Sequence, residues 1–271
     1  MKHTIVAATQ NKHKIVEIEA ITKEFGMDII SRDEAGVPDI EIVEDGTTFE
    51  ENSYKKAYEI MKLCGKITIA DDSGLEVDCL DGAPGVYSAR FAGEDGDDEA
   101  NNRKLIDLIK DVPYEKRTGR FVSVITMVFP DGESLVARGE VEGHLVLEEK
   151  GNHGFGYDPL FVPLGYENTF GELDSELKNR ISHRARALQK LREELEALNK
   201  EIQTAQQNYD LEKAAELQYG KIWSQTSEHV HTGIQAAAGS ILSGICGADR
   251  ILSAAFYRAD HPAGHTDPGC V

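Results

Sequence analysis

The chain has 271 residues, of which 40% are hydrophobic, and a formal net charge of −19 at pH 7. This length suits one large domain or a domain with an appendage, and the composition suits a packed core rather than a disordered chain. The negative charge argues against a general nucleic-acid-binding protein, because such a protein needs a surface rich in lysine and arginine.

No segment has the pattern of a targeting or membrane element. The amino terminus, MKHTIVAATQNKHK, lacks the long apolar stretch of a signal peptide, and no apolar run approaches the ~20 residues of a membrane helix. The four cysteines (Cys64, Cys79, Cys246 and Cys270) show neither CxxC pairing nor disulfide spacing, which fits a reducing compartment. We therefore expect a cytoplasmic protein without a membrane partner.

Strand and helix patterns alternate along the first 198 residues. In the first part we expect a strand at 3–8, a helix at 15–25 closed by Gly26, a strand and an irregular loop over 28–46, a helix at 48–64 stopped by Gly65, a strand at 66–70, an acidic turn at 71–74 and a loop over 76–98. We then expect a helix at 97–112, strands at 120–129 and 133–147, a glycine-rich loop leading into a short strand at 151–163, and one helix over 175–198. This order predicts an α/β fold with a mixed central sheet flanked by helices.

The turn from Thr9 to Lys14 joins the first strand to the first helix. A helix amino terminus presents unpaired N–H groups and a partial positive charge, which suit a phosphate. Thr9 or Asn11 is a candidate cap, and Lys12 and Lys14 add positive charge. The alternative is an ordinary capped surface helix.

Asp71, Asp72 and Ser73 follow the strand at 66–70. Carboxylates at the carboxyl end of a strand face the crevice where α/β sheets bind ligands, and Mg²⁺ prefers carboxylate oxygens. Alternation along a strand sends adjacent side chains to opposite faces, so we expect only one of the two aspartates to enter the site. Glu41 or Glu44 is a candidate second carboxylate; a plain Asp-Ser-Gly turn is the alternative.

Two further segments have features of a pocket for a planar ligand. In GFGYDP at 154–159 the glycines allow close backbone approach, and the aromatic rings offer a face for base stacking. Lys178, Ser182, His183 and Arg184 gather near the start of the last helix, where cations are disfavoured unless an anion or an acceptor lies nearby. A tight turn and a solvated helix start are the alternatives.

Six motifs in register resemble the non-canonical purine nucleoside-triphosphate pyrophosphatases, also called inosine triphosphatases or XTP/dITP diphosphatases. The motifs are T9-Q-N-x-x-K14, TFEEN at 48–52, IADDSGLEVD at 69–78, GAPGVYSARFAG at 82–93, GFGYDP at 154–159 and ISHRARAL at 181–188. Gln10 departs from the family, because many relatives have a small residue at this position. The resemblance covers almost all of residues 1–195.

The resemblance implies Mg²⁺-dependent hydrolysis of ITP, dITP or XTP to the monophosphate and pyrophosphate by a homodimer. Asp72 would be the catalytic carboxylate and a Mg²⁺ ligand, with Glu44 as the second metal ligand. The implied substrate-binding residues are Thr9, Gln10, Asn11, Lys12, His13, Lys14, Ser73, Arg90, Phe155, Gly156, Tyr157, Asp158, Lys178, His183 and Arg184. Their Lys, His and Arg donors suit a purine with a keto oxygen at position 6, whereas the amino group of ATP would leave buried donors unpaired.

The rest of the chain departs from this family. We expect a pyrophosphatase domain at 1–195, a helical connector at 196–222 and an extension at 223–271. The segment from about 190 to 222 resembles part of the coiled-coil middle domain of Clp-type disaggregases but carries no ATPase motif. Six residues of the extension are potential zinc ligands, but they lack the spacing of a zinc finger, so we expect no zinc site: His229, His231, Cys246, His261, His265 and Cys270. Deletion of residues 200–271 is expected to leave the activity largely intact.

Two other functions stay open at this point. One is a related pyrophosphatase that acts on modified pyrimidine nucleotides, and the other is a non-catalytic interaction protein whose connector and extension bind a partner. A panel of nucleotides separates the first from the expected enzyme, and release of pyrophosphate from ITP separates the second.

Overall fold

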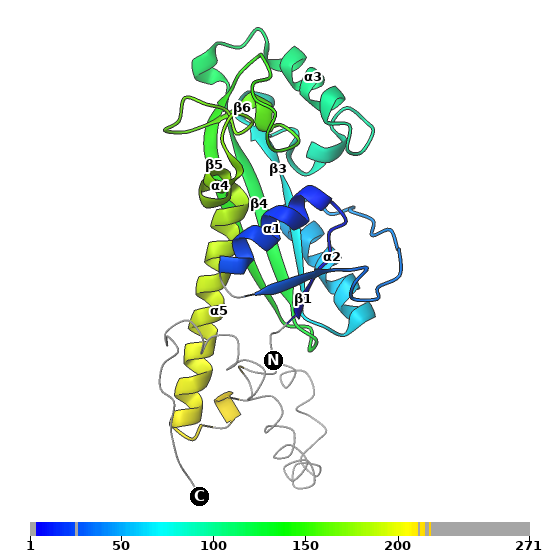
Figure 1. Ribbon diagram of the computed structural model, residues 1–271, viewed down its shortest axis with the longest axis vertical. Coiled ribbons are helices and arrows are strands. Elements are labelled where there is room, and N and C mark those ends of the chain that lie inside the picture. Colours follow the sequence, from blue (N-terminus) through cyan, green and yellow to red (C-terminus); the bar gives the residue numbers. More distant parts are fainter. Residues whose placement is uncertain (1–3, 25–26, 211, 215–216, 218–271) are drawn as a thin grey trace, which may run out of the picture.

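A mixed six-stranded sheet forms the centre of the fold in the computed structural model, which describes residues 4–24, 27–210, 212–214 and 217 (Figure 1). The strand order is β2-β1-β3-β4-β5-β6, with β1 parallel to β2 and β3, and the other neighbours antiparallel. The strands are β1 (Thr4–Ala7), β2 (Asp28–Ser31), β3 (Thr68–Val77), β4 (Thr118–Val128), β5 (Ser134–Leu145) and β6 (Phe161–Pro163). This architecture confirms the expected α/β class with a mixed sheet.

Helices cover both faces of the sheet (Figure 1). The α-helices are α1 (Lys12–Glu24), α2 (Phe49–Cys64), α3 (Asp98–Ile109), α4 (Ser175–Ile181) and α5 (His183–Gln207); short 3₁₀ helices lie at Asp78–Leu80, Gly85–Arg90, Tyr114–Lys116 and Asp158–Leu160. α2 packs on β3 and β4 from one side, and α5 packs on β4 and β5 from the other, together with α1. α3 lies at the far end of the long strands.

Side chains of β3 alternate between these two layers, as the period of a strand requires. Ile69 belongs to the apolar core beneath α1 and α5, whereas Ala70 belongs to the core beneath α2. Leu75 and Val77, further along the strand, pack into a third core that includes α3 and β6. Consecutive residues of β3 therefore serve different layers of the protein.

Local signals in the sequence fix the ends of α2. Thr48 and Glu51 form a capping box at its start, in which the Thr48 side chain accepts from the Glu51 N–H. Gly65 ends the helix with φ of 62°, a left-handed conformation that glycine adopts without a steric cost. The predicted helix at 48–64 and its stop at Gly65 are confirmed.

β3 is longer than predicted. The expected acidic turn at 71–74 is wrong, because β4 pairs with every residue of β3 from Thr68 to Val77. The expected loop over 76–98 is also wrong in part, since its first two residues end β3 and two 3₁₀ helices follow. Pairing with β4 overrides the turn preference of Asp-Ser-Gly, and buried cations compensate the carboxylates.

The single helix expected over 175–198 is two helices. Ser182 interrupts them with extended backbone (φ −66°, ψ 161°), and its side chain accepts from the Ala185 N–H at the start of α5. α5 then continues without a break across residue 195 to Gln207. Also, α1 starts at Lys12, earlier than expected.

Some predictions fall outside the described residues, namely Gly26 as the stop of the first helix and everything expected of residues 218–271. In the part of the chain that is described, no helix is long and apolar enough to cross a membrane.

Candidate functional site

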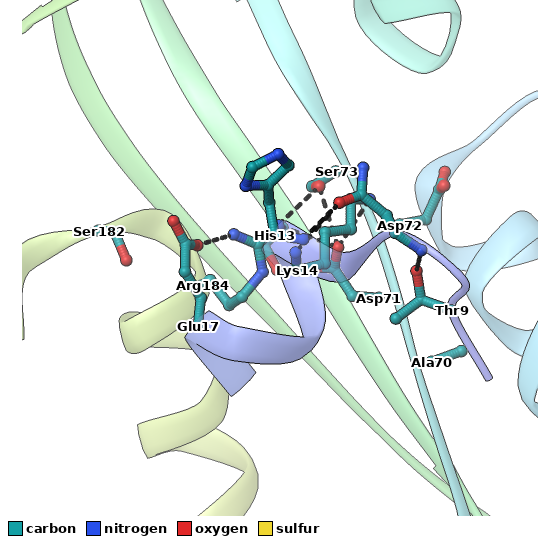
Figure 2. Close-up of polar contacts among 12 residues, drawn as sticks. Thr9, His13, Lys14, Glu17, Ala70, Asp71, Asp72, Ser73, Ser182 and Arg184 are labelled. Carbon is teal, nitrogen blue, oxygen red and sulfur yellow. Dashed lines mark hydrogen bonds and ion pairs between the residues drawn. The ribbon is translucent and has the colours of Figure 1, made fainter. Parts of the chain in front are cut away.

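Asp71, in the middle of β3, is the centre of a buried polar cluster (Figure 2). Its carboxylate pairs with Lys14 Nζ at 2.8 Å and with Arg184 Nη2 at 3.1 Å. Ser123 Oγ donates to it at 2.6 Å and Ser73 Oγ at 3.0 Å. Both carboxylate oxygens therefore accept hydrogen bonds, from groups on β3, β4, α1 and α5.

The amino terminus of α1 adjoins this cluster. Asn11 caps the helix, since its Oδ1 accepts from the backbone N–H groups of His13 at 3.0 Å and Lys14 at 3.2 Å. Thr9 Oγ1 in turn accepts from the Asn11 N–H at 3.1 Å. This ordered helix start, with the Lys14 ammonium beside it, suits an anionic group.

Glu17, one turn along α1 from Lys14, ties this helix to α4 and α5. Lys178 Nζ lies 2.7 Å from its carboxylate, and Arg184 also forms an ion pair with it. Burial alone would raise the pKa of Glu17, but Arg184 and Lys178 outweigh burial and lower it to about 2. Glu17 is therefore ionised at neutral pH, and it orients both cations.

The loop at 154–158 is closed by the carboxylate of Asp158. Its Oδ2 accepts from the Phe155 N–H at 2.8 Å and from Lys178 Nζ at 2.5 Å. Gly154 has φ of 78°, and a Cβ at this position would lie 2.0 Å from Asp158 Oδ2, so this turn requires glycine. From α3, Asp98 accepts the Gly156 N–H at 2.7 Å, and Asn102 donates to the Gly156 carbonyl at 3.2 Å.

The ring of Phe155 is surrounded by cationic and aromatic groups. His13 stacks on it with ring centroids 5.4 Å apart. Lys178 Nζ lies 5.0 Å and Arg184 Cζ 5.9 Å from the ring centroid. The ring thus offers a stacking face close to the start of α1.

His183, the first residue of α5, is buried and stacks on Phe121 with ring centroids 4.8 Å apart. Burial and the Arg184 cation hold the pKa of His183 well below its usual value, so the ring is neutral. Its Nδ1 is buried and has no hydrogen-bond partner among the described residues. Such a polar atom is suited to a ligand.

Asp72 faces the opposite layer, toward α2. Lys56 Nζ lies 2.7 Å from Asp72 Oδ1 and 3.1 Å from Glu44 Oε2, so one ammonium joins two carboxylates. Arg90 donates to the backbone carbonyl of Glu44 at 3.2 Å. Glu44 therefore lies at this cluster, whereas Glu41, the other loop glutamate considered, is exposed.

The two neighbouring aspartates differ in basicity. Burial alone would raise the pKa of Asp71, but Arg184 and Lys14 hold it well below its usual value. Burial raises the pKa of Asp72, and Lys56 does not fully offset it. Burial lowers the pKa of Lys56, yet Asp72 and Glu44 outweigh burial and the net pKa is raised. Neighbouring carboxylates with pKa values pushed apart are typical of sites in which only one of them accepts a proton.

The Asp72 cluster has the chemistry of a hard-metal site. Glu44 and Asp72 direct carboxylate oxygens at one position, and a cation, the Lys56 ammonium, already occupies it. Two carboxylates, completed by waters and phosphate oxygens, are a usual ligand set for Mg²⁺. Within the described residues, no group of three or more His, Cys, Asp or Glu side chains is placed to hold a metal. The donors fit a metal that also uses ligands from a substrate.

Other expected site residues lie around these clusters with separate contacts. Gln10 donates to Asp39 at 2.8 Å, and Lys12 is exposed. The Tyr157 hydroxyl donates to the Ser88 carbonyl at 2.8 Å and is thus committed to the fold. A cavity of about 750 Å³ lies elsewhere, between α1, α4, α5 and β5, and none of the expected site residues lines it.

Lys56 and Glu17 were not predicted as site residues. Lys56 is on the buried stripe of α2, between Ser53 and Ile60, where a lysine requires a buried partner. Glu17 follows Lys14 by one turn on a face that also buries Ile18 and Ile21. In both helices, a charged residue on the apolar face was the available signal.

The part of the chain that contains these clusters is similar to known proteins. The model of the Ham1 family matches residues 5–194. A protein named dITP/XTP pyrophosphatase from Clostridium perfringens is 51% identical over 201 residues, which are 72% of this chain and 98% of that protein. One of the same name from Bacillus subtilis is 46% identical over 197 residues, 73% of this chain and 98% of that protein.

Solved structures agree with these matches. The Ham1 protein of Staphylococcus aureus has a TM-score of 0.64 and 41% sequence identity, covering 72% of this chain and 98% of that one. A nucleoside-triphosphatase and dITP/XTP pyrophosphatase from Mycobacterium abscessus has a TM-score of 0.58 and 43% identity, covering 69% and 98%. Because the family model matches residues 5–194 and the fold is shared with these structures, the chain belongs to the Ham1 family.

Proposed function

We propose that the chain hydrolyses non-canonical purine nucleoside triphosphates (dITP, XTP and ITP) to the monophosphate and pyrophosphate. The observation that carries the proposal is that the chain covers 98% of a dITP/XTP pyrophosphatase at 51% identity. The site geometry supports it, because a helix amino terminus, a carboxylate pair and an aromatic loop surround the middle of β3. These three features suit a triphosphate, a metal and a base.

The triphosphate would lie at the start of α1. Thr9 and Asn11 hold this helix terminus in place, and Lys14 adds a positive charge. Gln10, Lys12 and His13 lie in the same turn, and Arg90, which donates to the Glu44 carbonyl, would add a positive charge from the side of the carboxylate pair. Ser73, held by Asp71 and Arg184, is the remaining expected contact on this side. Positive groups fixed before the reaction stabilise charge that develops on the leaving pyrophosphate.

Asp72 and Glu44 would hold Mg²⁺, which supplies charge neutralisation of the phosphates and lowers the pKa of a bound water. Asp72 is the better proton acceptor of the two adjacent aspartates, because burial raises its pKa while Asp71 is held ionised by Arg184 and Lys14. We assign to Asp72 the positioning or deprotonation of the attacking water.

The base would stack on Phe155 in place of His13. Lys178 and Arg184 border this face, and His183 offers a buried nitrogen that has no hydrogen-bond partner among the described residues. Donors of this kind suit the keto oxygen at position 6 of hypoxanthine and xanthine. The amino group of adenine would leave them unpaired, at a cost of ~1–3 kcal/mol each. Gly156, Tyr157 and Asp158 shape the loop that presents Phe155.

Product analysis on a panel of nucleotides tests the proposal. With Mg²⁺ present, dITP, XTP and ITP should release pyrophosphate, and ATP and dTTP should react at least about tenfold more slowly in kcat/KM. Release of orthophosphate, or preference for a pyrimidine nucleotide, would favour another house-cleaning phosphatase. Absence of any product would favour an interaction protein.

The same proposal includes the finer expectations. The activity resides in residues 1–195, magnesium is the metal, the assembly is a homodimer and the location is the cytoplasm. Chelation with EDTA should abolish pyrophosphate release and added Mg²⁺ should restore it. Light scattering of the full chain reports the oligomeric state.

A further inference from the structure

Among the described residues, Lys56 forms ion pairs with both carboxylates that are proposed to hold the metal, Asp72 and Glu44. Its Nζ lies 2.7 Å from Asp72 and 3.1 Å from Glu44, and the residue is only 8% exposed. An ammonium at these distances makes charge-assisted hydrogen bonds to both carboxylates. A metal ion bound to the same carboxylates would replace these hydrogen bonds with metal–oxygen bonds. Lys56 therefore sits where a bridging cation would sit.

The charges at this position allow one cation at a time. A divalent ion bound to Asp72 and Glu44 would lie within a few ångströms of the Lys56 ammonium, where repulsion in a partly buried site is strong. Among the described residues, no third His, Cys, Asp or Glu joins Asp72 and Glu44 to hold a metal, so a metal without a nucleotide gains few protein contacts in exchange. Displacing Lys56 also leaves its charge without a partner, unless another anion is present.

A triphosphate removes this obstacle because it supplies the missing anion. Lys56 is carried by α2, whose start is fixed by the Thr48 capping box and whose buried face packs Ala57 and Ile60 into the core. The helix is thus fixed, but the four-carbon stem of a lysine is flexible and its ammonium has three donors. The ammonium can turn from the carboxylates to a phosphate while the backbone stays in place.

We propose that Lys56 occupies the metal position in the free protein, so that the divalent ion binds there only together with the triphosphate. This inference rests on the proposed function and adds an order of binding to it. It predicts weak binding of free metal by the wild-type chain and strong binding once the Lys56 charge is gone. Lys56 is then a gate for the metal as well as a phosphate contact.

Titration of the full chain with Mn²⁺, followed by electron paramagnetic resonance of the free ion, tests the proposal without nucleotide and without turnover. Lys56→Met should bind Mn²⁺ at least about tenfold more tightly than wild type, because one positive charge is removed from the carboxylate pair. Lys55→Met is the matched control, since Lys55 precedes it on α2 and pairs with Asp45 instead. This control should bind Mn²⁺ like wild type.

Two further variants keep the result specific to this position. Lys56→Gln should show the same gain, which covers the case that the methionine variant fails to fold by circular dichroism. The double variant Lys56→Met/Asp72→Asn should lose the gain, because the ion then has only Glu44. Unchanged or weaker Mn²⁺ binding by folded Lys56→Met and Lys56→Gln would overturn the proposal, as would an equal gain in Lys55→Met.

Equilibrium dialysis with inorganic tripolyphosphate tests the order of binding. In wild type, tripolyphosphate should increase the protein-bound Mn²⁺ several-fold, whereas Lys56→Met should bind the ion before tripolyphosphate is added. Equal binding with and without tripolyphosphate in wild type contradicts the order. These readouts are independent of the product released from ITP, so failure of this inference and failure of the proposed function are distinguishable.

Discussion

The two faces of β3 treat adjacent aspartates in opposite ways. On the face toward α1 and α5, Asp71 is fully buried and accepts from Lys14, Arg184 and two serine hydroxyls. On the face toward α2, Asp72 forms an ion pair with Lys56, which it shares with Glu44. The strand period alone sends these neighbours to different layers, and the residues that meet them there decide their chemistry.

The difference shows that a carboxylate whose two oxygens are fully hydrogen-bonded, such as Asp71, differs in function from one that shares its cation, such as Asp72. Both oxygens of Asp71 have partners, so moving this carboxylate would leave the buried Arg184 and the partly buried Lys14 without it. At the Asp72 cluster we expect displacement of Lys56 to cost less, because Glu44 has 36% of its side chain exposed. We expect the first face to hold the site in shape and the second to react.

The largest expected effect is on the reacting face. Asp72→Asn should lower kcat for ITP by about 10⁴-fold, since the variant loses a proton acceptor and a metal ligand together. Pyrophosphate release at saturating ITP and Mg²⁺ measures it. The free energy of unfolding should change little, because Lys56 keeps Glu44 as a partner. If the variant keeps more than about a tenth of the activity, Asp72 and the face toward α2 do not carry the reaction.

On the other face the expected loss is of stability. Asp71→Asn leaves the buried Arg184 and the partly buried Lys14 without their shared carboxylate, which should cost about 3–5 kcal/mol. Urea denaturation monitored by circular dichroism gives this value. Asp78→Asn is a matched control on an exposed ion pair with Arg120, which should cost less than about 1 kcal/mol. Equal losses for the two variants would mean that burial of the Asp71 cluster contributes nothing.

Glu17 lies on the same face as Asp71, toward α1 and α5, and makes the stability of the protein sensitive to acid. Its pKa of about 2 lies below the usual value, so its contribution to stability is complete above about pH 4.5 and is lost as pH falls toward 2. Glu17→Gln should therefore cost about 3 kcal/mol at pH 7, and the gap to wild type should narrow below pH 4.5. Urea midpoints at a series of pH values measure it. A gap that stays constant down to pH 3 would contradict the pKa.

Local signals predicted the elements that depend on nearby residues, and missed those that depend on distant ones. The Thr48 cap and the Gly65 stop lie within α2 itself, so its ends followed from the sequence. The continuation of β3 through Asp71 depends on pairing with β4 and on Arg184, which is 113 residues away. No local pattern around the Asp-Ser-Gly segment records that partner.

The candidate site divides in the same way. His13, at the start of α1, stacks on Phe155, and Lys14 of the same helix interacts electrostatically with the Asp72–Glu44 pair, so these three parts lie near one another. Lys56 was not predicted because its two partners come from distant segments: Glu44 lies in a loop and Asp72 in β3, and both meet Lys56 on α2. The sequence pattern predicts a lysine on the apolar face of this helix, but it does not predict which carboxylates pair with it.

The smallest effect is expected from removing the end of the chain. The cores on the two faces of β3 extend as far as Leu195, and the family model ends at residue 194. Deletion of 208–271 keeps all of α5 and should leave kcat/KM for ITP within about twofold of wild type. Deletion of 196–271 also removes Ile202 and Ala205, which are buried, and should lower stability further. Loss of activity in the shorter deletion would mean that residues 208–271 contribute to the site together with the two faces of β3.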